Sequence, residues 1–542
     1  MKIRRLLIAS IVALPFASAG ADASSDGLRS VPSANPKATG VTVPTILSPE
    51  LAQVVVAQGS TPVENPTASV KRYGYLNDQP NLLPAFGSNV EATKTEPDKN
   101  AYLVLRDLTG ADPDYDYGRH FLFQGHEVGT PGAITRINLD ADAAHRVTVL
   151  ANAQQDGTPL PTIDGSTWYP WAERLLFSQE GNGSTSGGIW QATPDYPSVV
   201  ESLLGVLGRG GYEGIQADSD GNIWIVEDIG GSTVAGARLP NSFVYRFTPK
   251  NRFDLTQGGR LQALQVKSKA TGLPIVFQTA SALTQDIKDL HTYGNVFDTG
   301  WVTVHETDAD GFAVFNANAL AKTRGATPFK RPENGQFRPG SSFGEFYFDE
   351  TGDTSTTSTA IPDHGGFGGV MKLVQASPSA ATGTLTLFFK GDLEHAAFDN
   401  CAFWDEDHVV FVEDRGDGLH TQGNALDSGW MFDVRADYSN PARKPVRILA
   451  QGRDQSATID SGLLGTAGFQ NEGDNEITGI HVSDGDPTPH GLLGAKRPHP
   501  FEDGWRVFYT GQHGDNVTWE IIRSAHHDDD DDDGHGGHGG HQ

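Results

Sequence analysis

The chain has 542 residues and a formal net charge of −28, from 40 basic and 68 acidic side chains. A chain this acidic repels nucleic acid and anionic membranes, so we expect neither as a partner. We also expect a monomer. Cys401 is the single cysteine, which excludes an internal disulfide. Stability should therefore come from a large core and from bound ions.

The first residues have the organisation of an export signal. A basic start (Met1–Arg5) precedes an apolar stretch (Leu6–Phe16) and small residues up to Ala23, which predicts a signal peptide over residues 1–23. The apolar stretch is shorter than the ~20 residues that a membrane helix needs. We therefore expect a periplasmic or secreted protein without stable membrane insertion. Arg4-Arg5 leaves a twin-arginine route open, although an ordinary basic start is the favoured interpretation.

From about residue 100 onward, short apolar runs alternate with turn residues. The chain has 64 glycines, and Asp-Gly and Asn-Gly turns recur along it, which favours one repetitive β-structure over several separate domains. Several runs are apolar on both faces, so they should pack between neighbouring sheets. The predicted strands include His120–Phe123, Ile223–Val226, Trp301–Val304, Glu345–Phe348, Leu385–Phe389, Val409–Val412 and Arg506–Tyr509.

These patterns predict an all-β fold, a β-propeller of about six blades with loop and short helical insertions. The helical candidates are 281–290 and 316–322. We expect a lead-in with the first strands over residues 24–99 and the propeller over 100–523. The tail at 524–542 is rich in Asp, His and Gly, and we favour a disordered end over a metal-scavenging one.

Several predicted strands end in an acid or amide and then turn on Gly or Asp. The strand ends are Gln179-Glu180, Glu227-Asp228, His305-Glu306, Glu413-Asp414 and Gln512-His513. In a propeller, equivalent strand ends converge on one mouth of the central channel. Each acid taken singly is better explained as a solvated turn, but the ordered set predicts carboxylates that share bound cations.

Two local motifs suggest other functions, and neither has the required context. Gly340–Gly344 fits the G-x-S-x-G pattern of serine hydrolases, but a turn precedes it and a strand follows, where the nucleophile elbow needs a strand and then a helix. Asp112–Gly118 begins like a calcium-binding EF-hand loop, but Tyr117 occupies the position of the required glycine. We interpret it as a solvated acidic turn.

Six groups of segments follow one another over residues 120–515. They are Thr167–Trp171 with Ser178–Asn182, Gly211–Gly214 with Glu227-Asp228 and Phe243–Phe247, Phe329–Glu333, Phe398–Asn400 with Glu413-Asp414, Asn475–Gly479, and Thr510–Gly514. In this order they resemble the PhoX family of secreted alkaline phosphatases. The resemblance implies a phosphoric ester hydrolase with a six-bladed propeller, which holds Ca²⁺ and Fe³⁺ at the channel mouth and acts on small phosphorylated substrates.

The resemblance also implies the site residues. Arg331 and Glu333 would be catalytic, and the metal ligands would be Glu127, Asp164, Glu180, Glu213, Asp228, Glu333, Asp414 and Glu476. Carboxylate oxygens are the ligands that hard cations select. A metal cluster would neutralise the acids and lower the pKa of a water so that it becomes a nucleophile. The Arg331 guanidinium could bind the phosphoryl group through two parallel hydrogen bonds.

The chain departs from the family pattern at one metal ligand. The family's iron-ligating cysteine precedes the Pro-Trp segment, whereas this chain has Asp164 near that place. Cys401 lies in a different segment, and we expect it to be a small buried apolar residue. Two alternatives stay open: a calcium-dependent propeller that hydrolyses another ester, such as a lactone, and a non-catalytic binding propeller stabilised by calcium.

Overall fold

Antiparallel β-strands are the main regular structure of the computed structural model, which describes residues 27–33, 44–68, 70–76, 95–354, 361–452, 476–512 and 516–525. The predicted signal peptide and residues 526–542 of the predicted tail lie outside the described residues. So do Asn475 and His513 of the sequence motifs. The domain boundaries inferred from the sequence stay predictions.

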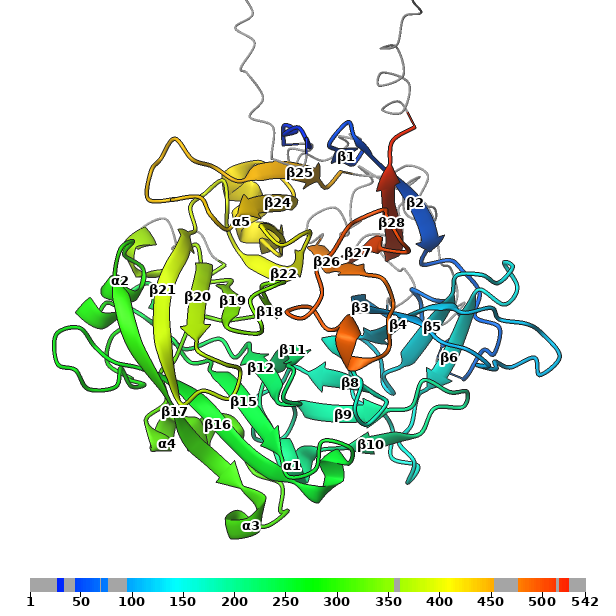
Figure 1. The fold of residues 1–542 in the computed structure, drawn as a ribbon, viewed down its shortest axis with the longest axis horizontal. Helices are drawn as coiled ribbons and strands as arrows, with labels where there is room; N and C mark the ends of the chain where they lie inside the picture. The colour runs from blue at the N-terminus through cyan, green and yellow to red at the C-terminus, as the bar shows by residue number, and fades with distance from the viewer. Residues whose placement is uncertain are drawn as a thin grey trace, which may run out of the picture.

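The strands form sheets that radiate from a common centre, like the blades of a propeller (Figure 1). From the centre outward, the first blades are β3 (Pro97–Val104), β4 (His120–His126), β5 (Ile134–Asn138) and β6 (Val147–Ala151); then β7 (Ser166–Tyr169), β8 (Arg174–Gln179), β9 (Gly188–Ala192) and β10 (Val200–Ser202); then β11 (Tyr212–Ala217), β12 (Ile223–Glu227), β15 (Val244–Pro249) and β16 (Gly259–Val266). We number these blades 1, 2 and 3.

Blades 4 to 6 continue the circle. They are β18 (Gly335–Phe337), β19 (Glu345–Glu350), β20 (Gly369–Gln375) and β21 (Thr382–Lys390); then β22 (Phe398–Phe403), β23 (His408–Glu413), β24 (Ser428–Asp433), β25 (Val446–Ala450) and β1 (Ile46–Leu47); then β26 (Glu476–Ser483), β27 (Arg506–Gln512), β28 (Val517–Arg523) and β2 (Leu51–Ala57). The long strand β17 (Val296–Glu306) pairs with β16 and β21, so it joins the outer edges of blades 3 and 4. The prediction of an all-β propeller is confirmed.

Short helices and one hairpin are inserted between the strands. The insertions are α1 (Leu204–Leu207), α2 (Gln285–Leu290), α3 (Thr307–Asp310), α4 (Ala317–Arg324), α5 (Gly416–Gly423), the 3₁₀ turns Leu255–Gln257, Pro362–His364 and Pro489–Gly491, and the hairpin of β13 (Thr233–Val234) and β14 (Ala237–Arg238). The described part of the chain contains no helix that is both long and apolar enough for a transmembrane span.

Both predicted helices form, and their starts are set by side chains that cap them. The Thr284 hydroxyl accepts a hydrogen bond from the Ile287 amide, so α2 begins later than the predicted residue 281. The Asn316 side chain accepts from the Ala319 amide and starts α4. Gly325, at φ 76°, then ends α4, because a left-handed residue at this place is favourable for glycine.

The blades are held together by apolar cores between neighbouring sheets. Strand β23 illustrates the arrangement: Val410 and Val412 pack toward blade 6, while Val409 and Phe411 pack toward blade 4. Successive side chains of a strand point to opposite faces, so a strand buried on both sides must be apolar throughout. The prediction that such runs pack between neighbouring sheets is therefore confirmed.

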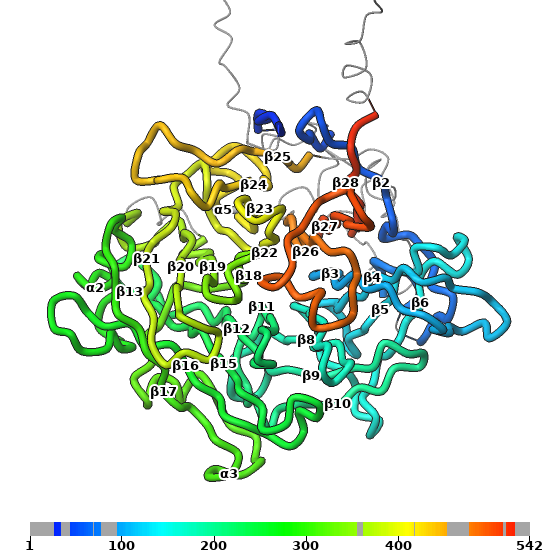
Figure 2. The backbone as a smooth tube through the Cα atoms, in the orientation of Figure 1, coloured from blue at the N-terminus to red at the C-terminus, as the bar shows by residue number. Residues whose placement is uncertain are grey.

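The two ends of the described chain close the circle. Strand β2 pairs with β28 and completes blade 6 (Figure 2), while β1 pairs with β25 at the outer edge of blade 5 (Figure 1). The carboxylate of Glu50 fixes the connection between them. It accepts hydrogen bonds from the Ser48 hydroxyl at 2.6 Å, the Arg29 amide at 3.1 Å and Arg29 Nε at 2.5 Å.

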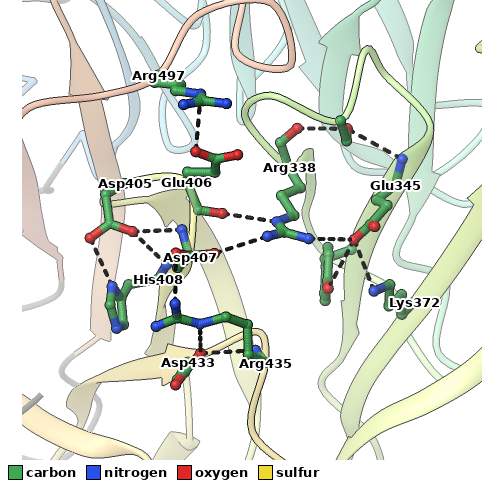
Figure 3. A network of polar contacts seen from close by, with 12 residues as sticks. Arg338, Glu345, Lys372, Asp405, Glu406, Asp407, His408, Asp433, Arg435 and Arg497 are labelled. Atoms are coloured by element: carbon green, nitrogen blue, oxygen red, sulfur yellow. Dashed lines mark hydrogen bonds and ion pairs between the residues drawn. The ribbon is translucent and has the colours of Figure 1, made fainter. Parts of the chain in front are cut away.

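Ion pairs fasten blade 4 to blade 5 (Figure 3). They lie at the other end of the strands from the central acids, because Glu333 precedes β18 whereas Arg338 follows it. Arg338, in the turn after β18, binds Asp407 at 2.9 Å and the carbonyl of Glu406 at 2.9 Å, both in the turn between β22 and β23. Lys372 and Arg338 share the Glu345 carboxylate. The G-x-S-x-G segment lies beside this network in the turn between β18 and β19, so the structure supports its rejection as a nucleophile elbow.

Replacing Glu50 with Gln should weaken the closure of the circle in a pH-dependent way. Although burial favours the neutral acid, the hydrogen bonds from Ser48 and Arg29 outweigh it and lower the Glu50 pKa from 4.5 to about 2. The stabilisation is therefore complete above pH 4.5 and is lost as the pH falls toward 2. We expect Glu50→Gln to lower the free energy of unfolding by about 1–3 kcal/mol at pH 7. Thermal unfolding from pH 2 to 7 measures this, with Glu502→Gln, an exposed acid, as control. A difference that does not shrink below pH 4 would contradict it.

Candidate metal centre

Every innermost strand brings one carboxylate to the same end of the channel. These acids lie in the first residues of the strand or just before it: Asp98 in β3, Asp164 before β7, Glu213 in β11, Glu333 before β18, Asp399 in β22 and Glu476 in β26. The inner strands of neighbouring blades lie side by side around the centre. Their starts therefore meet, and acids that are far apart in the chain become neighbours.

A second set of acids comes from the turn after the second strand of a blade. Glu127, Glu180, Asp228 and Asp414 directly follow β4, β8, β12 and β23. The residue before each turn has a different task. Glu227 accepts hydrogen bonds from the Phe243 amide at 3.1 Å and from the Tyr245 hydroxyl at 3.0 Å. Glu413 likewise accepts from the Trp430 indole at 2.9 Å, so the strand end holds the turn and the next acid faces the centre.

The two sets line one cavity of about 70 Å³. Its lining consists of ten acids and one arginine: Asp98, Glu127, Asp164, Glu180, Glu213, Asp228, Glu333, Asp399, Asp414, Glu476 and Arg331. Three overlapping groups have carboxylate oxygens within 4.8 Å of one another: Asp98 with Glu127 and Asp164, Asp164 with Glu180 and Glu213, and Glu213 with Asp228 and Glu333. Because neighbouring groups share a member, they describe adjacent positions for cations.

The most deeply buried acids have raised pKa values, and a bound cation would stabilise their ionised forms. Asp98, Asp164, Glu213, Glu333 and Asp399 are all buried. Burial, with neighbouring acids adding to it for most of them, raises the pKa of each, and that of Asp399 rises from 3.8 to about 8. Buried carboxylates are tolerated when they are paired or coordinate a metal. The donor set is made of oxygen atoms, which suits hard cations.

Arg331 lies at the rim among these acids. Its Nε and Nη2 atoms donate to Asp228 at 2.8 and 2.6 Å, Nη2 also donates to Glu333 at 2.8 Å, and Nη1 donates to Thr354 at 3.1 Å. The Arg331 backbone has a φ of 57°. A residue with a side chain pays on the order of 1–3 kcal/mol for this conformation, and such residues cluster at functional sites. The Thr351 amide, which donates to the Arg331 carbonyl at 2.8 Å, holds it there.

The floor of the cavity is a short polar chain that positions Glu213 and Glu333. Asn334 donates to Glu213 at 3.1 Å and accepts from the Lys99 ammonium beneath the cavity. Asp349 accepts from the backbone amides of Glu333 and Asn334 at 3.1 and 2.8 Å. These buried hydrogen bonds orient Glu213 and Glu333, and none of them involves a metal.

The structure brings together all of the site residues named from the sequence. Their roles as metal ligands and catalytic groups stay predictions. Asp98 and Asp399, which complete the set of one acid from each innermost strand, were not predicted from the sequence. The His305-Glu306 strand end was predicted at the mouth, but β17 is an outer strand and Glu306 lies opposite Arg260 of β16 in the sheet. Cys401 is buried in the apolar core beside Phe411, as expected.

Comparisons with known proteins agree with the geometry. Residues 235–486 match the family model of alkaline phosphatase PhoX. The structure of Pseudomonas fluorescens PhoX in complex with vanadate, a transition state analogue, is similar with a TM-score of 0.53 and 12% identity, over 92% of this chain and 98% of that one. A protein from Bacteroides thetaiotaomicron, provisionally assigned as a phosphatase, has a TM-score of 0.37 and 12% identity, over 88% and 79% of the two chains, which is too low to carry an argument. No curated protein matches the chain.

Replacing Asp399 with Asn should change stability in opposite directions with and without metal. Because the folded-state pKa is raised, the favourable contribution of Asp399 is complete below pH 3.8 and is lost as the pH rises through 8. In chelator, Asp399→Asn should therefore raise Tm above pH 8 and have little effect near pH 4, since the new amide oxygen can still accept from Asn400. In Ca²⁺, the same change should reduce the metal-induced rise in Tm.

Thermal unfolding in chelator and in Ca²⁺, from pH 4 to 9, measures both effects. Asp503→Asn is the control for the same chemical change. Asp503 is exposed, and its backbone has a positive φ, which asparagine adopts readily. A variant that is less stable than the wild type in chelator at pH 9 would show that the cavity does not strain the ionised Asp399.

Proposed function

We propose that this chain is a PhoX-like phosphoric ester hydrolase, which hydrolyses phosphate esters in a metal-dependent reaction at the acidic mouth of its propeller. One observation carries the proposal: ten carboxylates contributed by the six blades line one cavity together with a single arginine. Cations would neutralise the acids and leave the site able to accept an anionic substrate, which the acids alone would repel.

The donor set supports Ca²⁺ as the first candidate metal and Fe³⁺ as the second. The three groups of close carboxylates would hold the ions, with Asp164 and Glu213 shared between adjacent positions. Asp164 occupies the region of the family's cysteine, so any iron here would be bound by oxygen rather than sulfur. When bound, such a metal cluster supplies a Lewis acid for the phosphoryl oxygens and lowers the pKa of the attacking water.

Side chains of the protein would position the substrate and supply positive charge beside it. Arg331 points into the acidic cavity because Asp228 and Glu333 hold its guanidinium from one side. Its planar donors suit phosphoryl oxygens, and positive charge at this place stabilises the charge that develops during phosphoryl transfer. Asn334 and Asp349 keep Glu213 and Glu333 in place from beneath. A neutral lactone or carboxylic ester carries no negative charge for the Arg331 guanidinium to attract, so the arginine favours phosphate esters over these alternatives.

We also propose that the protein acts in the periplasm or outside the cell. The support is the signal-peptide organisation of residues 1–23, which lie outside the described residues. Calcium is an apt cofactor for a protein that folds and works in such a compartment, because extracellular modules can use weak calcium sites.

Removal of metal should abolish hydrolysis of a chromogenic phosphate ester. We expect p-nitrophenyl phosphate turnover by the purified protein to disappear after chelation and to return on addition of Ca²⁺, alone or with Fe³⁺. Elemental analysis of the untreated protein identifies the metals, and each metal added separately shows which one restores activity. Full activity in the presence of chelator would refute the proposal.

Changes at Arg331 and Glu213 should separate substrate binding from metal binding. We expect Arg331→Ala to lower kcat/KM for p-nitrophenyl phosphate by about 10²–10³-fold while the metal content is kept. Arg331→Lys should recover only part, because lysine cannot keep the paired hydrogen bonds to Asp228 and still donate to a phosphoryl oxygen. Glu213→Gln should instead lower both the metal content and the activity. The control is Asp503→Asn, and an Arg331→Ala variant with wild-type kcat/KM would exclude its proposed role.

A further inference from the structure

A larger hollow lies outside the metal cavity and shares part of its wall. It has a volume of about 730 Å³, and Glu180, Asp228, Arg331, Asp414 and Glu476 line both spaces. A single phosphoryl group needs a small part of this volume, whereas sites for whole small molecules commonly occupy 300–1,000 Å³. The hollow is therefore the place where the leaving group of a phosphate ester would lie.

Arg238 brings a second positive charge to this hollow. It is the last residue of the hairpin β13–β14, which is inserted between β12 and β15 of blade 3. Arg331, the other arginine in the wall, uses its Nε and both Nη atoms on Asp228, Glu333 and Thr354. Arg238 is different, since its guanidinium makes no hydrogen bond or ion pair with any residue that the structure describes. Its donors are thus available to a ligand.

The backbone beside Arg238 leaves room for its side chain. A Cβ atom placed on Gly230 would lie 2.6 Å from Arg238 Nη1 and 4.0 Å from Arg331 Cδ. The Arg238 guanidinium therefore rests against Gly230, on the same stretch of wall as Arg331. Gly181 and Gly416 also line the hollow. The acids of the wall, Glu180, Asp228, Asp414 and Glu476, also line the metal cavity, where bound cations would neutralise them.

We propose that Arg238 is a substrate-binding residue that recognises a second anionic group on the leaving group of the phosphate ester. The preferred substrates would then be phosphate monoesters that carry a further phosphate or carboxylate. A guanidinium with free donors binds either group through paired hydrogen bonds. This inference rests on the proposed function, because it assigns the first phosphoryl group to the metal cavity and Arg331.

Three matched esters test the preference with the full-length, metal-loaded protein. Phosphate release is measured for phenyl phosphate, carboxyphenyl phosphate and phenylene bisphosphate. We expect a higher kcat/KM for the two esters that carry a second anion. Arg238→Ala should reduce this preference about tenfold, which corresponds to the loss of one charge-assisted contact. The two anionic esters also distinguish whether a carboxylate or a phosphate is the better partner.

A second variant displaces the Arg238 side chain without removing its charge. Gly230→Ala would push the guanidinium away, and the backbone accepts alanine because Gly230 is not among the residues with positive φ. It should reduce the preference in the same direction as Arg238→Ala, so the test survives if the arginine variant folds poorly. Arg443→Ala is the control: Arg443 is exposed in the connection between β24 and β25 and does not line the hollow.

Binding measurements keep this inference separate from the proposed catalysis. Calorimetry with phenylphosphonate and carboxyphenylphosphonate, which are not hydrolysed, needs no turnover. We expect Arg238→Ala to weaken binding of the carboxylated compound about tenfold more than binding of the plain one. If both affinities fall by the same factor, or neither falls, the second-anion site is refuted even if the protein is an active phosphatase. If none of the three esters is hydrolysed by the wild type, the proposed function fails, while the calorimetric difference still decides the role of Arg238.

Discussion

The mutual repulsion of buried carboxylates at the centre is the constraint on which the rest of the structure depends. Acids from every blade are held at one mouth, where burial raises their pKa values and opposes their ionised forms. The chain resists this repulsion with apolar cores between all neighbouring sheets and with ion pairs such as those of Arg338. The scaffold thus brings together in space acids that are far apart in the sequence and that would otherwise repel one another.

Two adjacent acids at a strand end have different roles, and this difference allows the acids to be held at the centre. Glu227 and Glu413 look in the sequence like members of the acidic centre, yet their carboxylates bind backbone amides and aromatic donors of their own blades. The following residues, Asp228 and Asp414, are the ones that line the cavity. Two adjacent acids therefore serve opposite purposes: the first makes the turn rigid and the second presents charge.

Much of the fold and of the site could be predicted from the sequence, because both depend on short-range patterns. Runs such as Val409–Val412 are apolar throughout and so must be buried on both faces, and acids at strand ends in an ordered series indicate a shared centre. Acids in the first residues of an inner strand lacked such a signal. The family resemblance selected Glu213, Glu333 and Glu476 among them, whereas nothing selected Asp98 and Asp399. Glu306 had the signal, but strand-end chemistry does not reveal whether a strand is central or, like β17, peripheral. That distinction is set by tertiary pairing.

The pairing of β2 with β28 has a consequence for the order in which the molecule can mature. The last blade takes three strands from the end of the described chain and one from its beginning, so the circle stays open until β28 is present and pairs with β2. The donors at the hub come from strands as distant as β3 and β26. Capture of cations is therefore a late event in biogenesis, and a partly synthesised chain would carry its acids without the enclosure that gives them affinity.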